Sequence, residues 1–258
     1  MTHTFSHFRK LPLDLRVKIY KYVSVRDILL HKDVSYYDHI LWGRTIILAG
    51  ILNDIEALEL ASMQGEQQRE MICPILAFVG NWKALKWARR VDKEDDDDTK
   101  VVIKEKCSNI DNNSIPLPWD WKTCAYAAAG GHLRIVQWLY EMKCPWNQET
   151  SEYAAARGDL TMLRWLHQHH CPWGDYTYSM AAANGHFDLV QWLYEKNCPW
   201  NEGTCAYAAA GGNLHILQWL YEKHCPWNED TCCTAIAYGH YDVFQWAKSH
   251  GCPVPYGL

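Results

Sequence analysis

The sequence contains no hydrophobic run long enough for a membrane span and no export signal. Its longest uncharged, mostly apolar segment is 45–52, whereas a membrane-spanning helix needs about 20 apolar residues. The N-terminus, MTHTFSHFRK, is polar and basic, and no apolar signal-peptide core follows it. These absences disfavour secreted and integral membrane proteins, and we expect no membrane partner.

The chain also lacks an excess of positive charge. The formal net charge is −5, and the run 92–98 (DKEDDDD) accounts for all of it, with six acids and one lysine. The rest of the chain sums to zero, so no basic surface would attract a phosphate backbone. We therefore expect no nucleic-acid partner.

The motifs of common enzymes are missing as well. The sequence has no G-x-S-x-G, P-loop, H-E-x-x-H or G-x-G-x-x-G motif. Serine and threonine are sparse outside one regularly spaced column. Because no catalytic constellation is visible, the sequence predicts neither an enzyme nor a bound cofactor.

The second half of the chain has a period of 27 residues. Cysteine, proline, threonine, glycine and tryptophan each recur in one register, and five such columns cannot coincide by chance. Repeats of this length stack into a quasi-linear solenoid. The periodic cysteines are Cys144, Cys171, Cys198, Cys225 and Cys252, and one tryptophan column is Trp138, Trp165, Trp192, Trp219 and Trp246.

A weaker form of the same register extends upstream. NWKALKW at 81–87 matches HLRIVQW at 132–138, and DIEAL at 54–58 matches the same place one repeat earlier. We divide the chain into an N-terminal segment (5–38), two degenerate repeats (39–92), an acidic insertion loop (93–116), and five clear repeats with a C-terminal end (117–258).

Each repeat predicts two helices. In 144–170, Asn147 is a helix N-cap, Gly158 ends the first helix and Asp159 caps the second. The alanines 154–156 let a neighbouring helix approach closely. The second helix is apolar on most of its circumference, which is typical of a helix packed on several sides. The sequence therefore predicts an all-α fold.

The repeat resembles the ankyrin family. The ankyrin pattern T-x-x-x-A-A-x-x-G-H-L-x-x-V-x-x-L appears as TCAYAAAGGHLRIVQWL at 123–139. The usual ankyrin period is about 33 residues, and this chain lacks the residues of the β-hairpin finger. It is similar to short CPWN-bearing repeats of giant viruses and some protists. The resemblance implies an ankyrin-like α-solenoid of stacked helix-turn-helix repeats, without β-hairpin fingers, that binds a partner protein.

The N-terminal segment is similar to the start of an F-box. The matching pattern is L-P-x-D-L-x-x-x-I-x-x-Y, although YYDHIL replaces the family's usual basic and aromatic ending. An F-box docks on the Skp-family adaptor of a cullin–RING ubiquitin ligase, and the implied contact residues are Leu11, Pro12, Leu15, Ile19 and Tyr22. The alternative is that this segment is only a cap for the array, since terminal repeats need an atypical outer face.

Cysteine and histidine clusters invite a zinc hypothesis, which the spacing disfavours. His167, His169, His170 and Cys171 lie together, but the chain has no paired C-x2-C motif. The periodic cysteines are better interpreted as small buried side chains. Equivalent cysteines of stacked repeats should lie about 8–10 Å apart, too far for a disulfide, which needs about 7 Å or less. We expect no metal, free thiols, and a reducing cytoplasmic compartment, in the host if the source is viral.

Two other columns also have structural interpretations. His132, Asp159, His186, Asn213 and His240 share one position, which indicates a hydrogen-bonding cap rather than a general base. The tryptophans of the second helix are expected in the core. The tryptophans of the CPW turns are expected to pack between repeats.

The candidate binding residues lie in columns that vary while the repeat frame is constant. In an ankyrin-like stack such positions line one extended face that a partner protein would contact. The candidates are Trp121, Lys122, Gln148, Glu149, Glu152, Arg157, Asp175, Tyr176, Asn184, Glu202, Glu229, Asp230 and Tyr238.

Two functions remain compatible with the sequence. One is an interaction scaffold that serves as substrate receptor of an F-box ubiquitin ligase, with the array as reader. The other is a plain binding or sequestering module with no ligase link. In both cases we expect a monomer that binds one or more proteins.

Overall fold

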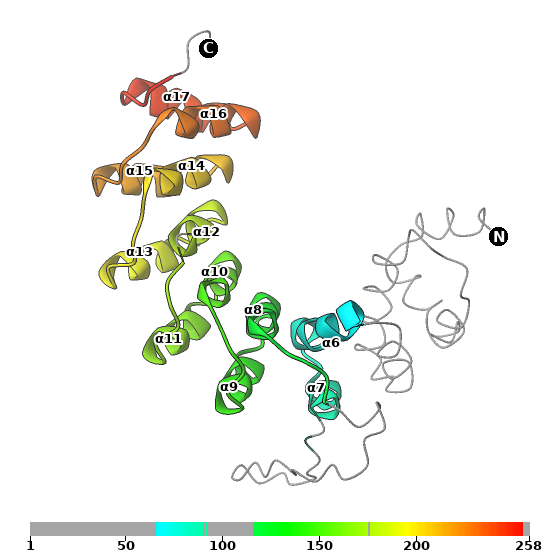
Figure 1. Ribbon diagram of the computed structural model, residues 1–258. Helices are drawn as coiled ribbons and strands as arrows, with labels where there is room; N and C mark the ends of the chain where they lie inside the picture. The colour runs from blue at the N-terminus through cyan, green and yellow to red at the C-terminus, as the bar shows by residue number, and fades with distance from the viewer. Residues whose placement is uncertain (1–65, 90, 92–115, 175, 255–258) are drawn as a thin grey trace, which may run out of the picture. The chain divides into compact units, whose positions relative to one another are not determined.

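A computed structural model describes residues 66–89, 91, 116–174 and 176–254 (Figure 1). These residues form twelve α-helices and contain no strand, which confirms the predicted all-α repeat fold. The F-box-like segment, the first degenerate repeat and nearly all of the acidic insertion lie outside the described residues. The chain divides into two compact units, Met1–Trp119 and Asp120–Leu258.

In the first unit, the described residues form a helix pair followed by a returning segment. The pair is α6 (Glu66–Val79) and α7 (Trp82–Ala88), and the Asn81 side chain caps α7 by accepting a 2.8 Å hydrogen bond from the backbone N–H of Ala84. Beyond the insertion, the N–H of Leu117 donates to the Ala88 carbonyl at 2.8 Å. The chain thus leaves and re-enters this helix pair beside the end of α7.

The second unit contains five helix pairs, one in each 27-residue repeat. Figure 1 shows the first helices in one row, on the inner side of a curve, and the second helices in an outer row. The pairs are α8 (Trp121–Gly130) with α9 (Leu133–Glu141), α10 (Gln148–Arg157) with α11 (Leu160–Gln168), α12 (Thr177–Ala183) with α13 (Phe187–Glu195), α14 (Glu202–Ala210) with α15 (Leu214–Glu222), and α16 (Glu229–Ala237) with α17 (Tyr241–Ser249).

Side-chain size explains why the two rows differ. Neighbouring first helices contact each other more extensively than neighbouring second helices do. The first helices meet through fully buried alanines such as Ala127, Ala154 and Ala181, which permit close approach. The second helices contribute the larger core residues, including the fully buried Leu139, Leu163, Leu193 and Leu220. Because neighbouring first helices lie closer together than neighbouring second helices, the array of five repeats curves.

The tryptophans of the CPW turns fill the wider gap between second helices. Trp146 stacks on Tyr140 of α9, with ring centroids 4.8 Å apart, and meets Trp165 of α11 edge-on at 6.0 Å. Trp173 lies in the same way between His167 and Trp192, and Trp227 between Tyr221 and Trp246. Packing between repeats is therefore confirmed as the role of these rings.

Hydrogen bonds from the turn column join one repeat to the next. Asn213 donates through Nδ2 to the carbonyl oxygens of Ala182 and Ala183, both at 2.8 Å. His186 Nε2 lies 3.0 Å from the oxygen of Ala156, at the end of the preceding first helix. These contacts satisfy carbonyls that a helix C-terminus leaves unpaired. The column is thus a hydrogen-bonding position. The predicted cap is wrong for His186, Asn213 and His240, whose side chains bond to the preceding repeat and not to the start of their own helices.

Asp159 is the exception in this column because a carboxylate cannot donate. It caps its own helix instead, accepting from the N–H of Met162 at 2.9 Å. The inter-repeat bond at this junction comes from Arg157, whose Nη1 lies 3.5 Å from the Ala129 oxygen. A residue that the sequence assigned to partner binding thus also joins two repeats.

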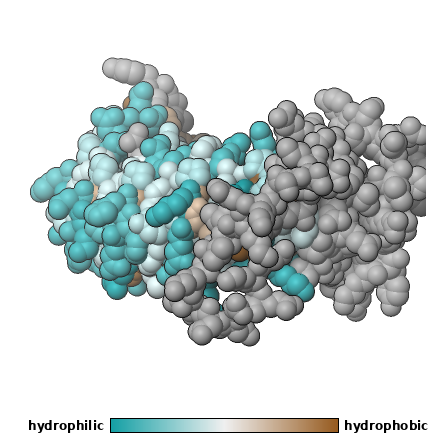
Figure 2. Space-filling model, turned by 60° about the horizontal axis from the view of Figure 1, so that its bottom comes forward, coloured by the Kyte–Doolittle hydropathy of each residue, from teal (hydrophilic) through white to brown (hydrophobic). Residues whose placement is uncertain are grey.

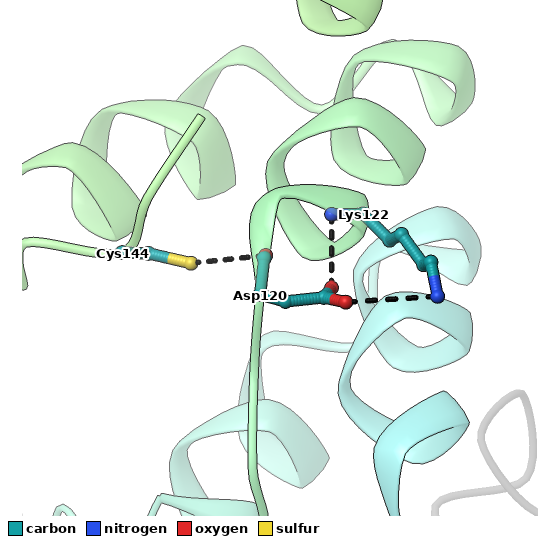
Figure 3. Close-up of polar contacts among 3 residues, drawn as sticks. All are labelled: Asp120, Lys122 and Cys144. Atoms are coloured by element: carbon teal, nitrogen blue, oxygen red, sulfur yellow. Dashed lines mark hydrogen bonds and ion pairs between the residues drawn. The ribbon is translucent and has the colours of Figure 1, made fainter. Parts of the chain in front are cut away.

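Four of the five periodic cysteines, Cys144, Cys171, Cys225 and Cys252, form a second set of inter-repeat contacts. Cys144 Sγ lies 3.5 Å from the carbonyl oxygen of Asp120, the N-cap residue of α8 (Figure 3). Cys171 contacts the Asn147 oxygen at 3.6 Å, and Cys252 contacts the Asn228 oxygen at 3.3 Å. All ten described cysteines are free thiols. Burial raises the pKa of the Cys171 thiol to about 12 despite an opposing hydrogen bond from the Ser151 backbone.

Candidate functional site

The row of first helices presents one continuous solvent-facing stripe, which we call the first-helix face. It consists of three positions per helix at spacing i, i+4 and i+7, which share one side of a helix. In α10 these are Glu149, Tyr153 and Ala156. Across the five helices the face comprises Lys122, Glu149, Tyr176, Gly203 and Asp230, then Tyr126, Tyr153, Met180, Tyr207 and Thr234, then Ala129, Ala156, Ala183, Ala210 and Ala237.

Tyrosine rings occupy the middle of this face. Tyr126 of α8 and Tyr153 of α10 meet edge to face with ring centroids 6.4 Å apart. Tyr176 and Tyr207 meet in the same manner at 5.9 Å. Tyr153 is 38% exposed and Tyr176 is 48% exposed. Aromatic rings held half in solvent supply large contact area at low entropy cost, which is why interfaces are rich in tyrosine.

Sequence analysis identified only part of this face. It found the column of Lys122, Glu149 and Tyr176, but it missed Tyr126, Tyr153 and Tyr207. These tyrosines lie four residues further on and therefore share the side of the helix with the identified column. The available signal was this helical spacing, combined with a column that holds tyrosine in three of five repeats.

Carboxylates outnumber cations along the first helices. Counted from each N-cap to each C-cap, the first helices carry six acids (Asp120, Glu149, Glu152, Glu202, Glu229, Asp230) and two bases (Lys122, Arg157). The second helices with the turns that end them carry six acids (Glu141, Asp159, Asp188, Glu195, Glu222, Asp242) and six bases (Arg134, Lys143, Arg164, Lys196, Lys223, Lys248). The negative charge of the array is therefore concentrated on one row.

Both cations of this row already have partners. Lys122 Nζ lies 3.7 Å from the Asp120 carboxylate, and the same carboxylate accepts from the Lys122 N–H at 2.9 Å (Figure 3). Arg157 donates to Ala129, as described above. In contrast, Glu149, Glu202 and Glu229 form no ion pair within the described residues. Burial, and then the charge of the Glu149 carboxylate, raise the pKa of Tyr153.

The candidate binding residues predicted from the sequence differ in their exposure to solvent. Glu152 differs from its neighbours because its column faces the adjacent first helix: Ala125 and Ser179 are buried there, and a Cβ added at Gly174 would collide with the Glu152 carboxylate. Trp121, Lys122, Glu149 and Glu152 are half-buried; Gln148, Arg157, Tyr176, Asn184, Glu202, Glu229, Asp230 and Tyr238 are exposed; Asp175 and the F-box-like contacts Leu11, Pro12, Leu15, Ile19 and Tyr22 lie outside the described residues.

The exposed surface of the described residues is mostly polar and carries several exposed aromatic side chains. Figure 2 shows a face on which hydrophilic residues predominate among those described. Of the large hydrophobic side chains exposed in the described residues, all but Phe78 are tyrosines. None of the described helices has the length and apolarity of a membrane-spanning segment. The described residues also contain no cluster of three or more His, Cys, Asp or Glu side chains that could hold a metal ion.

Comparison with known proteins supports the repeat assignment. Residues 178–221 match the family model described as ankyrin repeats in many copies. No curated protein matches this chain. Two solved structures of the pentatricopeptide repeat protein PPR10 in complex with an 18-nt psaJ RNA element are 13% identical to it. They cover 97% of this chain, which spans only 38% of that protein, and the TM-score is 0.38. Similarity this low supports no inference about function.

The local match and the helix pairs agree with each other. Residues 178–221 extend from α12 to α15 and therefore span two consecutive repeats of the second unit. The five helix pairs are ankyrin-like repeats, and ankyrin repeats are in general protein-interaction modules.

Proposed function

We propose that this protein binds a partner protein along the first-helix face. The observation that supports the proposal is the row of half-exposed tyrosines Tyr126, Tyr153 and Tyr207, flanked by carboxylates without ion pairs in the described residues. The periodic threonines and cysteines of the repeat are buried, and its turn residues contact a neighbouring repeat. They build the scaffold and leave this face available.

A matched set of tyrosine variants tests this proposal. The variant Tyr153→Ala/Tyr207→Ala removes two rings from the face, whereas Tyr241→Ala removes a 65% exposed ring from the start of α17 in the other row. Proteins cross-linked to the full chain in its native host would be compared by quantitative mass spectrometry. A partner bound through the face should be retained by Tyr241→Ala and lost from the double variant. If both variants retain every partner, the face is not the binding site.

A more specific proposal concerns the segment 5–38, whose L-P-x-D-L pattern supports an F-box. The array would then present substrates to a cullin–RING ubiquitin ligase, with Leu11, Pro12, Leu15, Ile19 and Tyr22 contacting the Skp-family adaptor. The alternative is a plain binding or sequestering module whose N-terminal segment caps the repeats.

Adaptor binding and repeat stability distinguish these two functions. For an F-box, adaptor and cullin subunits should co-purify with the full chain, and Leu15→Asp should abolish their recovery without changing the unfolding midpoint of the repeats. For a cap, the same substitution should lower that midpoint, and no ligase subunit should be recovered from the unmodified protein.

A further inference from the structure

We infer that the first-helix face binds a lysine- and arginine-rich segment of its partner. This inference rests on the proposed binding function and names the chemistry of the partner. Its basis is the combination of two independent features on one row of helices: open tyrosine rings and carboxylates that no cation of the described array neutralises.

The charge distribution selects a cationic partner. Glu149, Glu202 and Glu229 come from α10, α14 and α16, so that the negative charge extends along the row instead of gathering at one point. The two cations of the row are held by Asp120 and by the Ala129 carbonyl. A basic segment would gain ion pairs with these carboxylates, whereas an acidic peptide or a nucleic-acid backbone would be repelled.

The tyrosines select the same partner by a different interaction. A cation over the face of an aromatic ring is attracted by the ring quadrupole, and arginine also stacks on it. Because Tyr126 and Tyr153 meet edge to face, their contact does not cover both faces of each ring. The chain uses this chemistry elsewhere: the Arg89 guanidinium lies 3.8 Å from the centroid of the Trp119 ring.

The dimensions of the row fit a short extended segment. Packed helices are separated by about 8–10 Å, so five first helices span roughly 32–40 Å between their outer axes. An extended chain advances about 3.3–3.6 Å per residue, which corresponds to roughly 9–12 residues. Side chains on one side of an extended segment recur about every 7 Å. Basic residues at alternate positions would therefore meet a tyrosine or carboxylate from nearly every repeat.

Synthetic peptides provide the direct test on the full chain. The probes are three fluorescent twelve-residue peptides in which serine alternates with arginine, with glutamate or with glutamine. Binding is measured by anisotropy at low and high salt. We expect saturable binding of the arginine peptide alone, weakened at high salt because screening reduces the attraction between exposed charges. Equal binding of the arginine and glutamine peptides would overturn the inference.

Matched charge variants locate the binding site. Glu149→Gln/Glu202→Gln/Glu229→Gln removes three carboxylates from the first-helix row, and Glu141→Gln/Glu195→Gln/Glu222→Gln removes the same charge from the second-helix row. We expect the first variant to weaken the arginine peptide about tenfold, since three exposed ion pairs together are worth about that factor. The control variant should change it less than twofold. Equal effects, or an effect only when the acidic run 92–98 is neutralised, would overturn the inference.

The two proposals fail in distinguishable ways. If a partner is lost from Tyr153→Ala/Tyr207→Ala but its cross-linked segment is not basic, the face binds protein and only the inferred partner chemistry is wrong. If no partner depends on these tyrosines, the proposed function itself is wrong.

Discussion

Trp146, in the turn between α9 and α10, meets Trp165 of α11 edge to face, with ring centroids 6.0 Å apart and ring planes at 76°. Because Trp146 also stacks on Tyr140 of α9, it joins the second helices of two consecutive repeats. Equivalent contacts recur along the array. These tryptophan contacts therefore fix the separation between the second helices of consecutive repeats.

Replacing one of these tryptophans with alanine should destabilise the array strongly. Trp192 is 8% exposed and contacts both His167 and Trp173. We expect Trp192→Ala to lower the free energy of unfolding by about 3–5 kcal/mol, the usual cost of a large aromatic cavity. Urea unfolding followed by circular dichroism measures this loss. The control is Tyr241→Ala, which removes an exposed ring and should change the free energy of unfolding by less than about 0.5 kcal/mol. A similarly small effect of Trp192→Ala would contradict a core role for Trp192.

The inter-repeat hydrogen bonds depend on a donor at the turn position. Asn213→Asp would place a carboxylate against the oxygens of Ala182 and Ala183. We expect a loss of about 1–3 kcal/mol, because two carbonyls lose their donor and face a negative charge. Asn213→His is the control, since His186 and His240 donate at the equivalent positions. The prediction is wrong if thermal unfolding ranks the histidine variant below the aspartate variant.

Substitutions at two turn glycines distinguish the energetic cost of the backbone conformation from the cost of side-chain packing. Gly158 (φ +78) lies under the His186 ring, whereas Gly239 (φ +82) has no neighbour within 4 Å of an added Cβ. Gly239→Ala should cost about 1–2 kcal/mol for the left-handed conformation alone. Gly158→Ala should cost more, because the new methyl group must displace His186. Equal unfolding midpoints for the two variants would show that the histidine adds nothing at this turn.

Buried thiols should make the array sensitive to alkali. Burial raises the pKa of both Cys171 and Cys198 to about 12 in the folded chain, from 9.0 for an unburied thiol. The folded state keeps these protons while the unfolded state releases them, so stability should fall as the pH rises from about 9 to 12 and should be unaffected below 9. Cys171→Ala/Cys198→Ala should flatten this part of the profile of unfolding free energy against pH. An unchanged slope would contradict the prediction.

The sequence predicted the repeat and its helices because each signal is local and recurs. Asn147 and Asn228 at the N-cap position and the periodic turn glycines determine where the first helices begin and end. The roles of Arg157 and Glu152 could not be predicted in this way. Arg157 reaches the preceding repeat only because Asp159 cannot donate, and Glu152 lies against Gly174 only because this repeat lacks the usual asparagine there. Both roles depend on how two particular repeats meet.

The first-helix face was predicted only in part, for a similar reason. Column variation marks the positions that packing leaves free, and this reasoning identified Glu149 and Tyr176. It passed over Tyr153 and Tyr207, because a residue that repeats is easily taken for part of the scaffold. Only the side of the helix on which these rings lie shows that they face solvent.

Most side-chain hydrogen bonds between the described repeats run from one repeat to the repeat before it, although Ser151 donates to the Pro172 oxygen of the following repeat. Arg157, His186, Asn213 and His240 each donate to the preceding repeat from the turn between the two helices. Cys144, Cys171, Cys225 and Cys252 donate to the preceding repeat as well. A deletion or duplication of one whole 27-residue unit would keep the register in which these donors meet the carbonyl oxygens of the preceding repeat. A change of any other length would not. The array can therefore evolve in length by whole repeats, changing the length of the first-helix face while most junctions keep a bond of the same kind.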